Sequence, residues 1–240
     1  MRVGFQLAAL TALTMLSVTP ARADLVYSQP GDGTACNLSC FTSTFDFSSN
    51  FGIQTADNFS LTQVAAIGSV QWQGFYYDSV NPGNNPVSPD TDLWDISFYA
   101  DSSGLPEGLL YDEIATVSDT LLGTSSFEGS TVDVYSFTAT LPIPFDASAN
   151  TTYSFGPLSF QTNFNPFFLW SAATTQALDT NSASRALGGP DTSWFSEPDD
   201  RAFSLSTIPA TIPELSTWAM MLIGFAGLGF AGYRRARFTV

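Results

Sequence analysis

The chain has 240 residues and a net charge of −15, with seven arginines, 22 acidic residues, no lysine, no histidine and two cysteines. Without imidazole or lysine it cannot build a Ser-His-Asp, Cys-His or Ser-Lys nucleophile, and two cysteines alone cannot supply a zinc site. Between residues 24 and 212, two arginines stand against 21 acidic residues, which excludes the basic surface that binds nucleic acid.

Residues 1–23 have the three parts of a secretory signal peptide. A charged start at Arg2 precedes an apolar run over residues 3–18, and Ala21 and Ala23 form a small-x-small cleavage site. We therefore expect cleavage after Ala23 and a mature protein outside the cytoplasm. The alternative is that the segment is retained as a membrane anchor.

The two cysteines, Cys36 and Cys40, are separated by three residues. In an oxidising compartment they are expected to form a disulfide, which requires the chain to turn between them. The ring is small, so we expect a local link worth about 2 kcal/mol or less. A redox role would favour the tighter Cys-x-x-Cys spacing.

Residues 24–208 are rich in Ser, Thr, Asn, Gly and aromatic residues and poor in good helix formers, which predicts an all-β domain. Alternation of apolar and polar residues is clearest over residues 94–100 and 70–76, where we expect strands with one buried face. Further strands are predicted over residues 52–61, 111–120, 132–139, 152–160, 167–173 and 202–206. About eight to ten short strands separated by turns favour a two-sheet β-sandwich or jelly roll.

The alternation also predicts core positions. Trp72 and Trp94 occupy inward-facing positions of their strands, so we expect both in the core. Within residues 132–139 the alternation changes phase between Val134 and Tyr135, which predicts either a bulge or a strand covered on both sides.

Three acidic residues, Asp90, Asp92 and Asp95, lie at the start of the predicted strand over residues 94–100. Carboxylate oxygens are the ligands that Ca²⁺ prefers, so calcium is a candidate ligand here and at Asp199–Asp200; no other cofactor is indicated. Neither cluster has the EF-hand pattern, and solvated acids in turns are the alternative.

Trp194 lies in a polar segment between the turn at residues 188–190 and Arg201. A loop tryptophan beside polar groups can stack on a sugar ring while those groups hold its hydroxyls. Trp194 and Arg201 are therefore the candidate carbohydrate contacts, and a packing role for the indole is the alternative.

An enzyme remains as the competing class, because two carboxylates about 5 to 9 Å apart suffice to hydrolyse a glycosidic bond. The glutamates of the body are Glu107, Glu113, Glu128 and Glu197. Nothing in their spacing marks a pair, so we expect a protein that is not an enzyme.

The C-terminal region divides into a linker over residues 209–217, a charge-free stretch over residues 218–233 and a basic tail over residues 234–240. As a helix the charge-free stretch would be about 24 Å long, which flanking residues can extend toward the ~30 Å hydrocarbon core. Trp218 and Tyr233 sit where interfacial aromatics belong, and the arginines would stay on the cytoplasmic side. The pattern predicts a single transmembrane helix.

The sequence from Pro213-Glu214 through Trp218-Ala219 to Arg234-Arg235 resembles the PEP-CTERM sorting signal of exported Gram-negative proteins. The resemblance covers residues 213–237 and departs from the family's Pro-Glu-Pro start at Leu215. It implies recognition by an exosortase-type processing enzyme and a link to extracellular polysaccharide. The body, through strings such as those over residues 55–59 and 96–101, resembles sandwich domains of uncharacterised exported bacterial proteins.

These expectations combine into an exported protein that is anchored in the membrane before processing and then sorted to the cell surface or the extracellular matrix. Its expected role is structural, adhesive or carbohydrate-binding. A carboxylate-dependent enzyme acting on polysaccharide and an envelope protein without a specific ligand are the alternatives.

Overall fold

The computed structural model describes residues 23–36, 40–89, 93–174, 181–190, 192–208, 221–222 and 224–226. Ala23–Ile208 form one compact unit, the body, and the terminal segments form another. Several predicted features lie outside the described residues: Ala21 of the cleavage site, Asp90, Asp92, Pro213, Glu214, Trp218, Ala219, Arg234 and Arg235. Within the predicted C-terminal helix, the described residues 221–222 and 224–226 are helical, and no helix among the described residues is long and apolar enough to cross a membrane.

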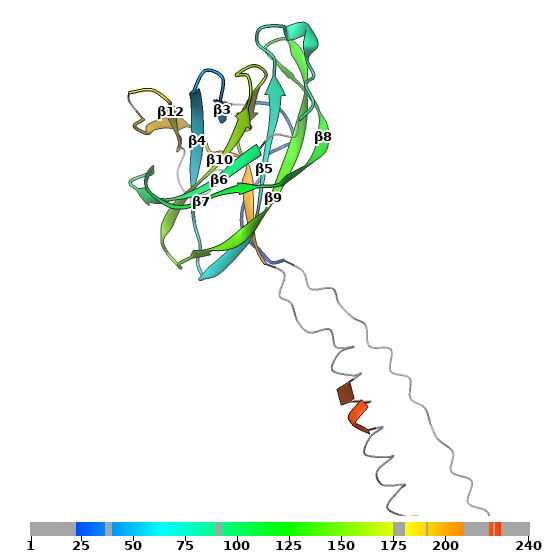
Figure 1. Cartoon of the computed structure of the whole chain (residues 1–240), viewed down its shortest axis with the longest axis vertical. Helices are drawn as coiled ribbons and strands as arrows, with labels where there is room; N and C mark the ends of the chain where they lie inside the picture. Colours follow the sequence, from blue (N-terminus) through cyan, green and yellow to red (C-terminus); the bar gives the residue numbers. More distant parts are fainter. Residues whose placement is uncertain are drawn as a thin grey trace, which may run out of the picture. The chain divides into compact units, whose positions relative to one another are not determined.

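The body is all-β, as predicted, and its strands form two sheets of seven strands each (Figure 1). The strands of sheet 1 are β1 (Leu25–Gln29), β2 (Phe41–Thr42), β5 (Ala65–Tyr77), β8 (Val117–Phe127), β9 (Ser130–Ala147), β11 (Phe167–Trp170) and β14 (Phe203–Thr207). The strands of sheet 2 are β3 (Thr44–Asp46), β4 (Phe51–Ser60), β6 (Leu93–Ser102), β7 (Leu105–Ala115), β10 (Thr152–Gln161), β12 (Asn181–Leu187) and β13 (Phe195–Pro198).

The strand order follows from the pairing. In sheet 1 the order is β1-β14-β5-β11-β2, with β9 beside β5 and β8 beside β9. In sheet 2 the order is β13-β12-β4-β3-β10-β6-β7. The pairing is antiparallel throughout except between β3 and β10, which run parallel.

An aromatic core fills the space between the sheets. Trp72 and Trp94, from opposite sheets, have ring centroids 5.0 Å apart, and both are buried, as predicted. Trp72 also stacks on Phe137 at 5.8 Å. Offset and edge-on ring packing of this kind contributes beyond the buried area alone.

A second, smaller apolar cluster covers the other face of sheet 1. Val132 and Val134 belong to this cluster together with Phe75, whereas Phe137 belongs to the core between the sheets. The phase change in β9 therefore marks a strand covered on both sides. A bulge lies opposite it in β8, where the register shifts between Leu121 and Gly123.

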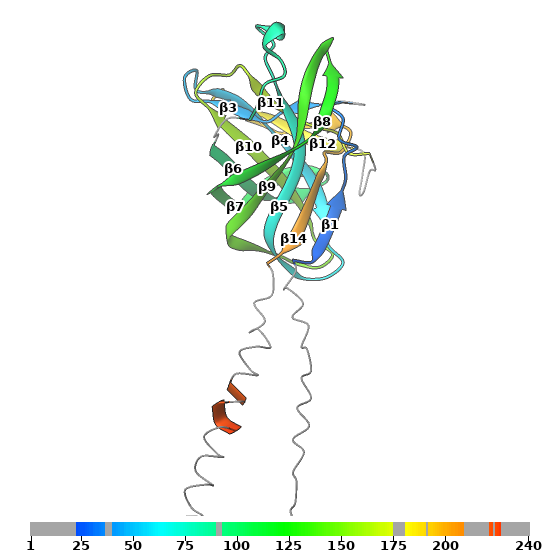
Figure 2. The ribbon, with the colours of Figure 1, turned by 90° about the vertical axis from the view of Figure 1, so that its right-hand side faces the viewer.

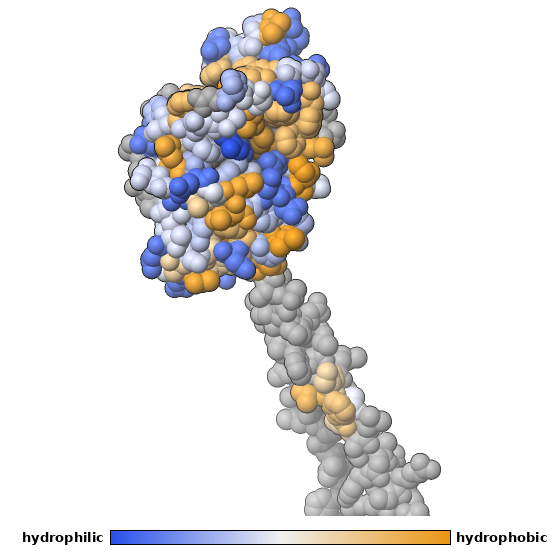
Figure 3. All heavy atoms as spheres, turned by 60° about the vertical axis from the view of Figure 1, so that its left-hand side comes forward, coloured by the Kyte–Doolittle hydropathy of each residue, from blue (hydrophilic) through white to orange (hydrophobic). Residues whose placement is uncertain are grey.

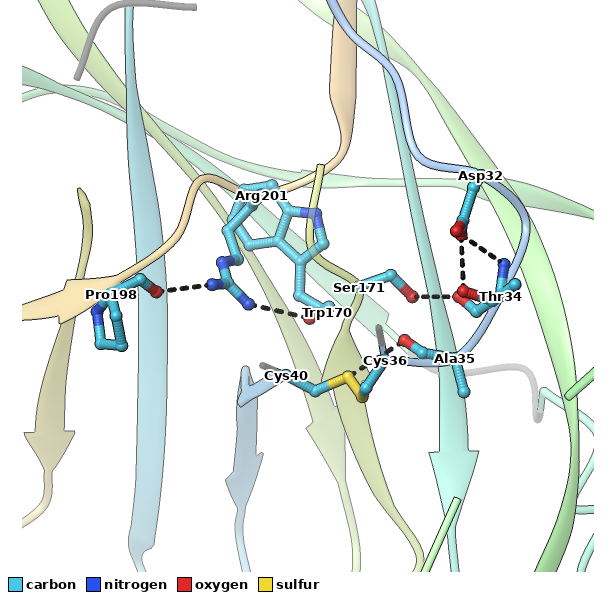
Figure 4. The surroundings of a disulfide bond; sticks show 9 residues. All are labelled: Asp32, Thr34, Ala35, Cys36, Cys40, Trp170, Ser171, Pro198 and Arg201. Carbon is cyan, nitrogen blue, oxygen red and sulfur yellow. Dashed lines mark hydrogen bonds between the residues drawn. A yellow bond between two sulfur atoms is a disulfide. The ribbon is translucent and has the colours of Figure 1, made fainter. Parts of the chain in front are cut away.

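The predicted disulfide between Cys36 and Cys40 is present, with Cα atoms 5.7 Å apart (Figure 4). Both cysteines pack against the second cluster, beside the fully buried Ala35. The segment before the disulfide is fastened to sheet 1 because the Ser171 hydroxyl donates to the Thr34 carbonyl at 3.4 Å. The disulfide therefore helps to hold this short segment against the outer face of sheet 1.

The prediction of a single strand over residues 111–120 is wrong. The chain changes sheet at Thr116, so that β7 ends in sheet 2 at Ala115 and β8 begins in sheet 1 at Val117. An extended chain that crosses between two sheets keeps its side-chain alternation, and the sequence therefore does not mark the crossing. The strand predicted over residues 167–173 also ends early, at Trp170.

The two ends of the body lie side by side. Leu25 of β1 pairs opposite Ser206 of β14, and the Thr207 backbone N–H donates to the Asp24 carbonyl at 2.9 Å. The loop between β5 and β6 lies at the opposite pole of the body (Figure 2). The first strand of the body therefore begins, and its last strand ends, at one pole.

Candidate functional site

A cluster of four polar and aromatic side chains lies on the outer face of sheet 2. Strands β4 and β12 of this sheet lie toward the left of Figure 1, the side that Figure 3 brings forward. Arg185 of β12 pairs opposite Gln54 of β4, and Tyr99 comes from β6. Trp194 comes from the segment just before β13. Because successive side chains of a strand point to opposite faces, the inward packing of Phe98 turns Tyr99 outward.

Arg185 is held in one orientation by its neighbours. Its Nε and Nη2 donate to Gln54 Oε1 at 3.1 and 2.7 Å, and Nη2 also donates to the Tyr99 hydroxyl at 3.1 Å. The guanidinium carbon lies 4.5 Å from the ring centroid of Trp194. The Trp194 and Tyr99 rings are 5.4 Å apart and close to perpendicular. We call these four residues the Arg185 cluster.

A pocket of about 340 Å³ lies beside the Arg185 cluster on the same face. One part of its lining is apolar, from Phe45, Leu158 and Phe160. The rings of Phe45 and Phe160 pack edge to face at 5.9 Å. The polar part includes Asp95 and two members of the cluster, Gln54 and Arg185. In Figure 3, hydrophobic and hydrophilic residues alternate over short distances on this side of the body.

Asp95 is the acidic group in the lining of the pocket. Burial, reinforced by the neighbouring Asp112 carboxyl, raises the pKa of Asp95 to about 8. The Ser97 hydroxyl donates to Asp95 Oδ2 at 3.2 Å, and the charge of Arg185 opposes the rise. At neutral pH the Asp95 carboxyl therefore holds its proton and can donate a hydrogen bond.

The calcium prediction is not settled by these residues. Asp95 lies on the outer face of sheet 2, while Asp90 and Asp92 lie outside the described residues. Among the residues that the structure describes, no three acidic or cysteine side chains gather in a metal-binding arrangement. Asp199 and Asp200 follow β13, and Asp200 is buried.

Arg201, predicted with Trp194 as a candidate ligand contact, is fully buried and lies near Trp170 and Pro198 (Figure 4). Its Nη2 donates to the carbonyls of Pro198 and Asp199 at 2.9 and 2.8 Å, and its guanidinium lies 4.8 Å from the ring centroid of Phe41. Burial lowers the pKa of Arg201 to about 10, which leaves it charged at neutral pH. The arginine that packs on Trp194 is Arg185.

A buried polar network around Asp57 was not predicted from the sequence. Asp57 points into the body, and it accepts hydrogen bonds from Gln29 Nε2 at 2.8 Å and from the Arg201 backbone N–H. Burial raises the pKa of Asp57 well above its usual range. The network joins β1 to β4 and to the segment before β14, and is structural.

The four glutamates considered for catalysis stand on separate elements. Glu107 and Glu113 lie on β7, Glu128 lies in the turn between β8 and β9, and Glu197 lies on β13, where it accepts a hydrogen bond from Ser184. The carboxyl neighbour that faces the pocket residue Asp95 is Asp112 of β7. This pair could not be recognised from the sequence, because its members lie on different strands and are distant along the chain.

A second pocket, of about 400 Å³, lies at the loop pole of the body. Its lining consists of uncharged residues, among them Ser88, Gln161 and Asn163, with the buried Tyr76 below. It is larger than the outer-face pocket. The outer-face pocket nevertheless offers more for recognition, because it combines ring faces, a cation and a titratable donor.

Comparison of the chain with protein families, with curated proteins and with solved structures finds no match. Conclusions about function therefore depend on the site itself.

Proposed function

We propose that the protein is an exported carbohydrate-binding protein whose binding face is the outer face of sheet 2. The observation that carries the proposal is the fixed stack of Arg185 on Trp194 beside a pocket with both apolar and polar lining. Carbohydrate sites combine ring faces for the C–H surfaces of a sugar with oriented polar groups for its hydroxyls. The Arg185 cluster and the pocket supply both.

The cellular part of the proposal rests on the sequence. The signal peptide over residues 1–23 directs export, and the PEP-CTERM-like segment over residues 213–237 directs sorting through a membrane helix by an exosortase-type enzyme. The protein would act at the cell surface or in the matrix, next to extracellular polysaccharide.

Binding is tested by applying the full chain to a glycan array, with Trp194→Ala as the test variant. Phe195→Ala is the matched control, because Phe195 is the next residue and is 54% exposed. We expect Trp194→Ala to bind at least tenfold less glycan than the unmodified chain, and Phe195→Ala to bind as much as the unmodified chain. Equal glycan binding by both variants would refute the proposal that Trp194 belongs to the binding site.

Sorting is tested separately by the intact mass of the protein recovered from the cell surface. The proposal predicts an N-terminus at Asp24 and a C-terminus near Pro213. A chain that still carries residues 1–23 would contradict export by a cleaved signal, and an end at Val240 would contradict processing.

One observation favours a second candidate, a carboxylate-dependent enzyme acting on polysaccharide. Asp95 keeps its proton at neutral pH, faces a pocket and has Asp112 as its neighbour, which are properties of a general acid. Turnover on a panel of polysaccharides, abolished by Asp95→Asn, would establish this activity. Binding without turnover would leave the carbohydrate-binding role.

A further inference from the structure

The arginines of the body differ in what they can reach. Residues 24–208 contain two arginines, of which Arg201 is fully buried and bonded to backbone carbonyls. Arg185 is partly exposed at the pocket. A ligand that approaches from solvent therefore meets the positive charge of the body at Arg185.

Within the part of the chain that the structure describes, Arg185 is not paired with a carboxylate. Its hydrogen bonds go to the neutral oxygens of Gln54 and Tyr99, and no carboxylate lies within salt-bridge distance of it among the residues that the structure describes. A guanidinium held in place by neutral partners keeps its remaining N–H donors and its full charge for a ligand. This arrangement fits an anion.

The rest of the pocket is compatible with an anion. Asp95, the acid in the lining, keeps its proton at pH 7, so it does not repel a negative group. The apolar wall of Phe45, Leu158 and Phe160 offers surface for the C–H face of a sugar ring. A charged contact and a ring contact therefore lie within one pocket.

We propose that this pocket binds a carboxylated sugar, a uronic acid unit of an acidic polysaccharide, with the carboxylate on Arg185 and the ring against Phe160. The inference rests on the proposed carbohydrate-binding function and narrows it to acidic glycans. Arginine and carboxylate form short, charge-assisted hydrogen bonds whose planar geometry selects a carboxylate over a hydroxyl. The selection is local, because the acidic body as a whole repels polyanions.

The test compares matched ligands by calorimetric titration of the full chain. The probes are tetragalacturonic acid, tetramannuronic acid and the methyl ester of each, which keeps the sugar and removes the charge. We expect the full chain to bind at least one acid roughly ten- to a hundredfold more tightly than its ester. The comparison on the unmodified chain does not depend on any variant folding.

Variants then locate the preference. Arg185→Gln should reduce the ratio of acid to ester affinity to about one, and Arg185→Lys should restore part of it because lysine keeps the charge without the planar fork. Leu121→Ala, at an exposed position of β8 in the other sheet, should leave the ratio unchanged.

Two results would overturn the inference, and they are distinguishable. Equal affinity of the unmodified chain for acid and ester would refute selection of the carboxylate while leaving carbohydrate binding intact. Failure to bind the acids, the esters and every neutral glycan of the array would refute the carbohydrate-binding function as well.

Discussion

The proton held by Asp95 makes the stability of the folded protein depend on pH. The pKa of Asp95 is about 8 in the fold, against 3.8 for the unperturbed carboxyl. Between these values the folded state keeps a proton that the unfolded state releases. The contribution of Asp95 to the free energy of unfolding is therefore fully present below about pH 4 and is lost as the pH rises through about 8.

The expected size follows from linkage. A difference of one bound proton changes the free energy of unfolding by about 1.4 kcal/mol per pH unit, so the contribution of Asp95 falls by roughly 3 kcal/mol between pH 5 and pH 7 at most. The substitution Asp95→Asn keeps a neutral, hydrogen-bonding group of the same shape that cannot ionise. We expect Asp95→Asn to remove this dependence of the free energy of unfolding on pH.

The assay is urea unfolding followed by tryptophan fluorescence at pH 5, 6, 7 and 8, for the unmodified chain and for Asp95→Asn. The buried Asp57 also has a raised pKa and adds a slope of the same sign, so the difference between the two proteins isolates Asp95. Asp112→Asn should flatten the slope in part, because it removes the neighbouring carboxyl. Equal slopes in the unmodified chain and Asp95→Asn would refute the assignment of the proton to this residue.

Three further predictions concern stability and binding. Replacing Cys36 and Cys40 with serine should lower the free energy of unfolding by about 2 kcal/mol, measured by denaturation, because the five-residue ring no longer restricts the unfolded chain; a loss near zero would contradict this. Arg201→Met should cost about 3–5 kcal/mol in the same assay, since it leaves buried carbonyls without their donor, whereas Arg185→Gln, at the partly exposed arginine, should cost less than about 1 kcal/mol; similar losses would contradict the burial difference. The affinity for a uronic acid oligomer, measured by calorimetric titration, should fall roughly tenfold as the pH rises through about 8, because Asp95 then ionises and repels the carboxylate. The affinity of Asp95→Asn should not change over the same pH range.

The sequence predicted the central strands and the core well because strand alternation is a local property. The expected strands over residues 70–76 and 94–100 lie within β5 and β6, and their tryptophans meet in the core. The short polar strand β12 was missed, since its small Ser and Ala residues carry no apolar alternation.

The arginine that packs on Trp194 was not predicted from the sequence. Arg201 was named with Trp194 as a candidate ligand contact, but β12 and β13 form a hairpin in which Ser184 pairs opposite Phe195. Continuing that register by one residue places Arg185 opposite Trp194. The glycine and proline turn over residues 188–190 lies between Arg185 and Trp194 and indicates a hairpin, which brings residues on its two sides close together.

The buried pair of Asp57 and Arg201 could not be predicted from local pattern. Both are charged residues, and charged residues are rarely buried unless they have partners. Some of those partners, Gln29 for Asp57 and the Trp170 carbonyl for Arg201, come from distant parts of the chain. Only the strand pairing of the fold brings them together.

The binding face is tested most directly by the indole N–H resonances of the ¹⁵N-labelled full chain during titration with the oligosaccharide that the array ranks highest. The chain has five tryptophans, and Trp194→Phe assigns the signal of interest. We predict that the Trp194 signal shifts on binding while those of the buried Trp72, Trp94 and Trp170 stay in place. Saturable binding that leaves the Trp194 signal unmoved would contradict the outer face of sheet 2 as the site.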